Sequence, residues 1–482
     1  MKLMKSIVLL FICTAASIYA QNYNDALRLT EPGFVTSPRA LGMGNAYIAA
    51  GNDFSASLFN PAGFGLVNRT EFSASVNYNS FKNNTAFLGK NTNYSNSVTD
   101  INQVGFALPL PTSQGSLVLG FGFNQYKKFD SAVKFSGFNS ANNSMIQDLT
   151  SYNDDIAYEL GLSYPLFDNQ NQHIKDTTLI GGQLNQSGNI VQSGGLNSWT
   201  FSGAIEFQKN LFVGINLTRI DGDFRRDREY WEDDIYNNYP LSLRLDPDYP
   251  ETADFQSFYL NDIIRWDVGA WDLTLGLLAK LNDNFNFGFT IRLPRTFDIN
   301  ETYYVDANAD FGTGKSYYLD PPIENKVEYS IKSPMEIAVG GAFNKNNITV
   351  SFDAKMIDYS QMEFKSGLDE GAISDNNRDI KDLFRTVINM NAGVEYVIPN
   401  LGLALRGGFM FRPSPFVDDP SEYDKKFVTL GIGIETNKNV TFNLGYAYGW
   451  WKDIGDNYDS GISRTNQEIT HNNLLMGIKY YF

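Results

Sequence analysis

The stretch Val440–Trp450, VTFNLGYAYGW, alternates two kinds of side chain. From Phe442 onward every second residue is aromatic or leucine, and the residues between them are Asn, Gly or Ala. The same period of two recurs in Val428–Ile434 (VTLGIGI) and Phe285–Ile291 (FNFGFTI). A period of two predicts β-strands with one apolar face. Because the opposite face carries small, uncharged residues, the pattern indicates an all-β transmembrane barrel whose apolar face meets lipid.

Very short turns between such stretches predict the number of strands. They join predicted hairpins near residues 102–126, 199–220, 266–293, 335–358, 386–411 and 427–450. With a first strand near 70–81 and a last one near 472–482, we expect fourteen antiparallel strands. The connections at 127–198, 221–265 and 294–334 are long, and this asymmetry is typical of outer-membrane barrels with both termini in the periplasm. The segment 156–165 also alternates, but a fifteenth strand would break the up-and-down order, so we expect it in a hairpin within a long loop.

The two ends of the chain predict an outer-membrane location. Lys2 and Lys5 precede a short apolar run, and we expect residues 1–20 to be a signal peptide cleaved after Ala20. The single cysteine, Cys13, lies within that peptide. The last strand ends on Phe482, and a terminal Phe on an alternating strand is typical of substrates of the barrel assembly machinery. Outer-membrane lipid and lipopolysaccharide are therefore expected partners.

Composition excludes several functions. The net charge of −16 over 482 residues argues against nucleic acid, whose phosphates need a basic face. One cysteine and two histidines offer no catalytic constellation and no cysteine-based metal site. We therefore expect no enzyme, no catalytic or metal-binding residue and no cofactor.

Residues 21–69 are not strand-like and carry few charges, and they are rich in Ala, Gly and aromatic residues. Such a segment could not remain solvated as a tail, so we expect it to fold inside the barrel as a plug. Asn60 suits a helix cap and Pro61 the first helical position. Inward glycines in the predicted strands leave room for this plug.

The run Ala40–Gly63, ALGMGNAYIAAGNDFSASLFNPAG, resembles the N-terminal hatch of the FadL/TodX family of outer-membrane transporters for long-chain fatty acids and aromatic hydrocarbons. The segment Ala404–Phe416, ALRGGFMFRPSPF, resembles C-terminal strands of that family. The resemblance implies a hatch at 21–69, a barrel at 70–482 and passive uptake of hydrophobic small molecules. The residues that match the hatch signature are Gly42, Met43, Gly44, Asp53, Asn60, Pro61 and Ala62.

The family also implies loop capture of ligand, a pocket above the hatch and a lateral gap at the third strand. The third strand is predicted at Gly115–Tyr126, where Gly120 and Gly122 either form a gate or simply make room for the plug. Aromatic residues of the long loops and inward-facing cations are the candidate ligand contacts. They are Phe129, Phe135, Phe138, Trp231, Arg292, Lys355 and Arg406.

A second function stays open. The fold is also similar to barrel subunits of type IX secretion, which pass exported proteins to the cell surface. The acidic, aromatic segment 221–266 suits a protein partner at the extracellular loops as well as it suits a lipid.

Overall fold

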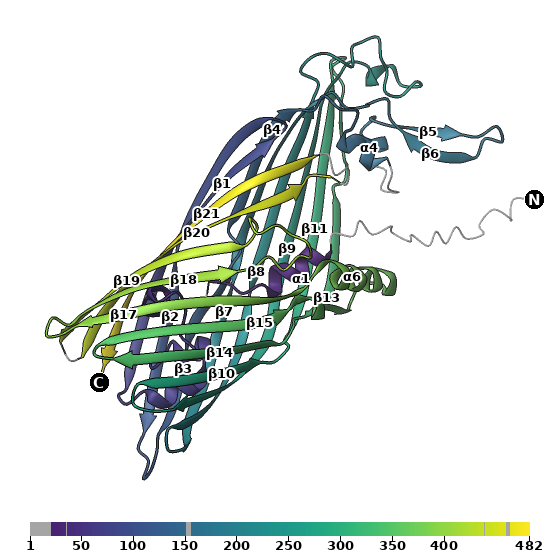
Figure 1. Cartoon of the computed structure of the whole chain (residues 1–482). Helices are drawn as coiled ribbons and strands as arrows, with labels where there is room; N and C mark the ends of the chain where they lie inside the picture. The colour runs from purple at the N-terminus through teal and green to yellow at the C-terminus, as the bar shows by residue number, and fades with distance from the viewer. Residues whose placement is uncertain (1–20, 35, 151–155, 438, 459–462) are drawn as a thin grey trace, which may run out of the picture.

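The computed structural model describes residues 21–34, 36–150, 156–437, 439–458 and 463–482. They form a closed antiparallel barrel of fourteen strands (Figure 1). The ring closes because β1 (Glu71–Phe87) pairs along nearly its whole length with β21 (Arg464–Tyr481). The predicted fold class and strand number are confirmed. The predicted signal peptide lies outside the described residues. Within them, no helix is long and apolar enough to cross a membrane.

Ten strands of the wall are unbroken and four are interrupted. The unbroken ones are β1, β2 (Lys90–Leu110), β7 (Asn185–Gln208), β8 (Leu211–Asp233), β9 (Phe255–Lys280), β17 (Thr386–Ile398), β18 (Leu403–Arg412), β19 (Lys425–Asn437), β20 (Val440–Asp456) and β21. The interrupted ones are β3 (Leu117–Lys128) with β4 (Ser131–Phe138), β10 (Phe285–Arg292) with β11 (Thr296–Phe311), β13 (Ile323–Lys332) with β14 (Glu336–Lys345), and β15 (Ile348–Asp358) with β16 (Glu363–Ser366). A short strand, β12 (Ser316–Tyr318), folds back on β11.

The wall is much taller on one side than on the other. Strands β7, β8 and β9 have 24, 23 and 26 residues, whereas β17 and β18 have 13 and 10. A tilted strand needs only about 9–11 residues to cross a bilayer. The expectation that 127–198, 221–265 and 294–334 are loops is therefore wrong in large part, because much of each is strand that extends well past the length a bilayer needs (Figure 1).

The reason lies in which face of a strand is apolar. In the first part of β8, outward residues such as Ile215 and Leu217 are exposed and apolar, as lipid contact requires. Further along, Ile220 and Phe224 are apolar and buried inside, while outward Asp221 and Asp223 are exposed. The apolar face changes from outside to inside where the strand leaves the membrane. Because of this change of phase, the alternation did not predict the part of β8 that lies beyond the membrane.

An extracellular dome caps the tall side of the barrel. It contains α4 (Met145–Leu149), α5 (Ile156–Glu159), η2 (Pro250–Thr252) and a separate hairpin of β5 (Tyr164–Phe167) and β6 (His173–Thr177). The segment 156–165 lies outside the barrel wall, as expected, but only Tyr164 and Pro165 belong to the β5–β6 hairpin. The first residues of the segment form a helix rather than a strand. On the short side, η3 (Tyr359–Gln361) and α6 (Glu370–Leu383) connect β15 to β17.

Candidate functional site

The inward side chains of β8 and β9 divide the lumen into layers. From the periplasmic end outward, Gly214 and Gly276 face residues of the plug, then Asn216, Thr218, Asp272 and Thr274 form a polar layer, and Ile220, Phe224, Val268 and Trp266 form an apolar one. Above these, Arg226 and Arg228 both pair with the fully buried Asp262. Tyr230, Leu260 and Phe258 then belong to the apolar core of the dome.

The structure places residues 21–34 and 36–69 inside the barrel, and the segment 21–69 is called the hatch from here on. It contains α1 (Tyr23–Thr30), α2 (Pro38–Gly42), α3 (Ala56–Phe59) and η1 (Pro61–Leu66). The Asn60 side chain accepts a hydrogen bond from the Ala62 amide at 3.1 Å and donates to the Leu277 carbonyl of the wall at 3.0 Å. The predicted cap at Asn60 and the helical start at Pro61 are confirmed, although the helix is of the 3₁₀ type.

Strand glycines let the hatch backbone approach the wall. A methyl group on Gly42 would lie 2.9 Å from the Cα atom of Gly431, and Gly44 adopts a positive φ of 61° beside the carbonyl of Ala392. Asn60, Pro61 and Ala62 lie against Gly214 and Gly276 in the same way. Glycines on both surfaces therefore fix where the hatch sits.

Buried charges hold the middle of the hatch. The carboxylate of Asp53 pairs with Nζ of Lys479 at 2.6 Å and accepts a hydrogen bond from Tyr47 Oη at 2.9 Å. Burial alone would raise the pKa of Asp53, but Lys479 and Arg39 outweigh it and lower that pKa to about 2. Tyr47 and Ile48 also donate their backbone amides to one oxygen of Asp353 on β15, at 2.6 and 2.9 Å.

A second ion-pair cluster joins α2 to the wall. Glu395 on β17 accepts from Arg39 at 2.8 Å and from Arg406 on β18 at 2.6 Å. The Arg406 side chain is only 4% exposed. Arg406 contacts the hatch and is not among the residues that line the polar cavity beside it. Its ion pair therefore holds the hatch to the wall.

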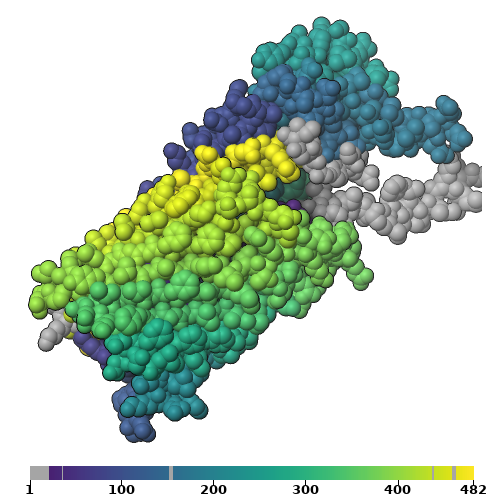
Figure 2. Space-filling view, viewed as in Figure 1, coloured from purple at the N-terminus to yellow at the C-terminus, as the bar shows by residue number. Residues whose placement is uncertain are grey.

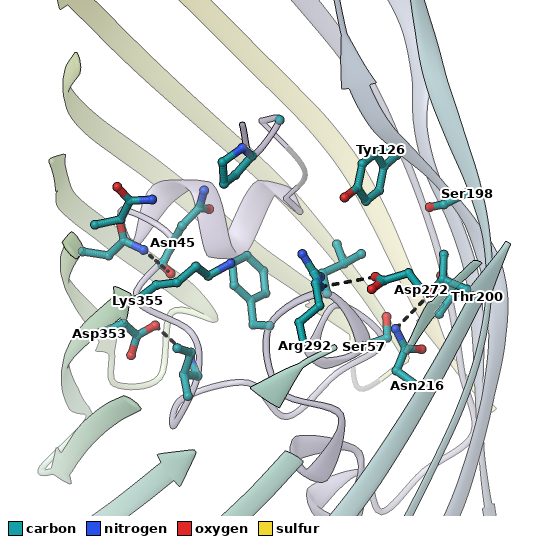
Figure 3. A pocket seen from close by; sticks show the side chains of 18 of the residues that line it. Asn45, Ser57, Tyr126, Ser198, Thr200, Asn216, Asp272, Arg292, Asp353 and Lys355 are labelled. Atoms are coloured by element: carbon teal, nitrogen blue, oxygen red, sulfur yellow. Dashed lines mark hydrogen bonds and ion pairs between the residues drawn. The ribbon is translucent and has the colours of Figure 1, made fainter. Parts of the chain in front are cut away.

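A polar cavity of about 100 Å³ lies beside the hatch in the lower lumen (Figure 3). Arg292 and Lys355 both line it, as the alternation predicted. Arg292 pairs with Asp272 at 3.3 Å, and Lys355 pairs with Glu336 at 2.9 Å. These two cations are already paired with lumen carboxylates, whereas Arg412, which also lines the cavity, donates to the Pro32 carbonyl at 3.2 Å.

The apolar layer above this cavity forms one continuous group of buried side chains, called the upper lumen core. Its members are Ala26, Leu29, Tyr126, Phe129, Leu196, Ile220, Phe224, Ile264, Trp266, Val268, Ala270, Phe297, Ile299, Tyr329, Ile331, Ile357, Tyr359, Met362, Phe364, Ile380, Phe384 and Val387. Tyr126 also lines the polar cavity, so the two regions meet there.

Helix α1 occupies the centre of the upper lumen core. Ala26 and Leu29 are completely buried, and the Arg28 guanidinium lies over the rings of Phe224 and Trp266 at 4.7 and 5.4 Å. The buried Glu301 accepts hydrogen bonds from Trp266 Nε1 at 2.8 Å, from Tyr329 Oη at 2.9 Å and from the Gln21 side chain. The interior of the upper lumen core is thus filled by α1.

Residues 204–481 match the family model described as outer membrane protein transport protein (OMPP1/FadL/TodX). The chain belongs to this family. The solved structures of the P. putida toluene transporter TodX and of a Pseudomonas aeruginosa FadL homologue both have TM-scores of 0.55, with 13% and 12% identity, covering 94% of this chain and 99% of theirs. The CymD monoaromatic hydrocarbon channel has a TM-score of 0.51 at 13% identity, over 93% of this chain and 99% of its own. No curated protein matches the chain.

In this FadL/TodX-type barrel the predicted loop aromatics do not gather on one surface. Phe129 belongs to the upper lumen core, whereas Phe135 packs against Phe87 in the dome core at 4.8 Å. Phe138 lies against Tyr236 in the dome. Trp231 packs on Tyr259 of the neighbouring strand. Of these four, only Phe129 lies where a ligand in the lumen could reach it.

Gly120 and Gly122 of β3, for which a gate and room for the plug were both open, contact the hatch. A methyl group on Gly120 would collide with the ring of Phe64, and one on Gly122 with the ring of Phe54. Both residues pair with β2 on one side and β7 on the other, so the ladder continues through them. This geometry favours room for the hatch over a gate at β3.

Sequence reasoning missed Trp266, Glu301 and Asp272. Glu301 lies in a segment expected to be a loop, whereas Trp266 and Asp272 lie in the predicted hairpin 266–293 and were not singled out. The inward position of Trp266 could have been predicted, because Trp266, Val268 and Ala270 alternate with Asp267 and Gly269. The apolar residues of that segment point inward, opposite to those of a membrane strand.

Proposed function

We propose that this barrel moves apolar or amphipathic small molecules, such as fatty acids or aromatic hydrocarbons, passively across the outer membrane. The observation that supports it is the upper lumen core, an apolar region inside the wall that a hatch helix occupies. Burying a hydrocarbon chain is favourable by about 0.8 kcal/mol per CH₂. An apolar ligand that replaces α1 would gain this burial, while the polar cavity below, beside Tyr126, would receive a carboxylate or hydroxyl head.

The hatch residues, including Met43, close the periplasmic route in this arrangement. Since α1 and the ligand compete for one space, weakening the contacts of α1 with the upper lumen core raises the fraction of barrels that can bind the ligand. Apparent affinity rises with that fraction.

The test uses the contacts of Arg28. Arg28→Ala removes the guanidinium from Phe224 and Trp266 and should increase the apparent affinity for brominated dodecanoate several-fold. Binding is measured by quenching of Trp266 fluorescence, taken as the difference between each protein and its Trp266→Phe version. Asn24→Ala, on the exposed side of α1, is the matched control and should leave affinity unchanged. Absence of Trp266 quenching by brominated dodecanoate and by brominated toluene would remove the proposal.

A protein-interaction role is the second candidate, and the exposed β5–β6 hairpin favours it. Phe167 and Ile174 are 53% and 62% exposed there, outside the barrel wall and away from the lumen. A secreted protein that binds this hairpin would be handed over at the cell surface, as in barrels of type IX secretion. Co-purification of a stoichiometric secreted partner that depends on the hairpin tests this role.

A further inference from the structure

The outer face of the tall wall carries a row of large side chains across four neighbouring strands. The register places Phe123 of β3 opposite Trp199 of β7. It places Arg219 of β8 between Trp199 on one side and Trp271 of β9 on the other. Residues opposite one another in antiparallel strands point to the same face of the sheet, so the whole row faces outward. Trp199 and Trp271 are 46% and 56% exposed there.

This row lies at the upper boundary of the lipid-facing surface. Directly below it the outward residues are exposed and apolar, as Phe201, Leu217 and Leu275 are. Directly above it on β8 the outward residues are the exposed Asp221 and Asp223. Tryptophan is enriched where lipid meets water, at the level of the polar headgroups. The phosphates of the outer leaflet are therefore expected at the height of this row.

The protein does not neutralise the charge of Arg219. Its guanidinium lies 5.6 Å from the ring centroid of Trp271, and its one hydrogen bond within the described residues is to the Ala270 carbonyl, at 3.5 Å. Asp221 lies on the same face two residues further on, but no ion pair joins the two. A methyl group on Gly269 would lie 2.7 Å from Nη2 of Arg219, so the glycine leaves the space that the guanidinium occupies.

The other arginines of β8 all have carboxylate partners. Arg225 pairs with Asp227 at 2.7 Å, and Arg226 and Arg228 pair with the buried Asp262. Each of these lies further along the strand, beyond the lipid-facing part. The arginine at the lipid boundary is thus the one on this strand whose counter-charge the chain does not supply, which suits an anion that belongs to the membrane.

Aromatic rings form a firm surface beside the arginine. The ring of Phe121 is stacked on that of Trp199, with centroids 5.6 Å apart, and lies 4.7 Å from that of Phe201. Phe123 packs edge-on against Trp199, also at 5.6 Å. This outward cluster on β3 and β7 extends downward from the level of Arg219, so it can support acyl chains that descend from a headgroup held there.

From this arrangement we infer that Arg219, framed by Trp199 and Trp271, binds a phosphate of lipid A in the outer leaflet. A guanidinium can donate two parallel hydrogen bonds to one phosphate, with a gain from the opposite charges. The phosphate monoester of lipid A carries up to about two negative charges at neutral pH, more than the single charge of a phospholipid diester, which is the reason for choosing lipid A. The site faces the membrane and not the lumen, so the inference does not depend on the transport proposal.

Native mass spectrometry of the detergent-solubilised barrel, titrated with diphosphoryl lipid A, measures the binding. Arg219→Ala should weaken the retention of lipid A about tenfold, since charge-assisted hydrogen bonds are lost. Arg219→Lys should give an intermediate affinity, because it keeps the charge and loses the fork. Gly269→Val, which takes the space of the guanidinium and leaves the charge in place, should also weaken binding. Arg225→Ala, on the same face above the row, is the matched control and should bind as the wild type does.

Two further lipids test which chemical group is recognised. Lipid A without its phosphates should bind the wild type no better than intact lipid A binds Arg219→Ala. Equal retention of intact lipid A by the wild type and Arg219→Ala would overturn the site, and so would equal retention of the intact and dephosphorylated lipids by the wild type. Phosphatidylglycerol bound as tightly as lipid A would overturn the assignment to lipid A. A heat-modifiable band in gel electrophoresis confirms that each variant is folded.

Discussion

Single residues on the inner wall decide how the hatch is seated. Gly407 and Gly408 are neighbours on β18 and face opposite sides. A methyl group on Gly408 would collide with the backbone of Gly44, whereas one on Gly407 would have its first neighbour at 3.9 Å. Neither residue has a positive φ, so the requirement for glycine at 408 is one of space. The sequence predicted inward glycines as room for a plug, and these contacts show which hatch atom each one admits.

Gly408→Val should therefore unseat the hatch around Gly44 while the barrel still forms. Single-channel conductance in planar bilayers should rise, because water and ions can pass the displaced segment. Gly407→Val adds the same volume to the lipid-facing side and serves as the matched control, with conductance equal to that of the wild type. Equal conductance of both variants would show that the hatch tolerates this collision.

The Lys479–Asp53 pair gives a second prediction at this scale. Lys479→Met leaves the buried Asp53 with the Tyr47 hydrogen bond and with Arg39, 3.9 Å away, as its remaining cation. Removing one partner of a buried pair costs about 3–5 kcal/mol. Thermal unfolding of the detergent-solubilised protein should move to lower temperature. Arg464→Met, which breaks the exposed pair with Asp456, should have little effect.

The pH dependence of that difference follows from the Asp53 carboxyl. Its pKa of about 2 lies below the usual value near 3.9, so its contribution is fully present above about pH 4 and is lost as the pH falls through 2. The gap in stability between wild type and Lys479→Met should therefore narrow between pH 4 and 2. A gap that stays constant over this range would show that Asp53 is not the partner that matters.

At the scale of elements, strands were predicted correctly where their apolar residues face the lipid. Within the membrane, Phe442 and Leu444 face lipid and the hairpins were found near their observed positions. Beyond the membrane, Phe224 and Trp266 face inward. There the apolar side of the alternation marks the interior of the barrel and not the lipid.

The role of β3 can be decided by pairing two substitutions. Gly120→Val should lower ligand uptake, because the added side chain collides with Phe64 in the hatch. If seating of the hatch is the cause, Phe64→Ala in the same chain should restore part of the lost uptake by freeing the space. If Gly120 acts as a gate in the wall, the second substitution should restore nothing. Uptake of radiolabelled dodecanoate by cells that express each variant measures the difference.

On the scale of the whole molecule, the barrel is a short cylinder with a tall half-wall that supports the dome (Figure 2). The tall strands β7, β8 and β9 build both the upper lumen core on their inner face and the base of the dome core above it. Composition and strand count predicted that the chain forms a closed cylinder in the outer membrane. The height of one side was not predictable in this way, since it depends on where each strand leaves the lipid.

The lumen and the β5–β6 hairpin lie in different parts of the molecule, so a deletion can test the two candidate functions separately. Replacing residues 165–176 by a short Gly-Ser link removes the β5–β6 hairpin, which forms its own two-stranded sheet. The dome core should survive, because Leu162 and Ile180 on either side of the hairpin are buried and stay in the chain. Trp266 quenching by brominated dodecanoate should be unchanged, since no layer of the lumen contains a hairpin residue. Binding of a secreted partner, measured by co-purification, should be lost if the hairpin is its docking site. A variant that lost quenching while keeping its heat-modifiable band would instead place ligand capture on the dome.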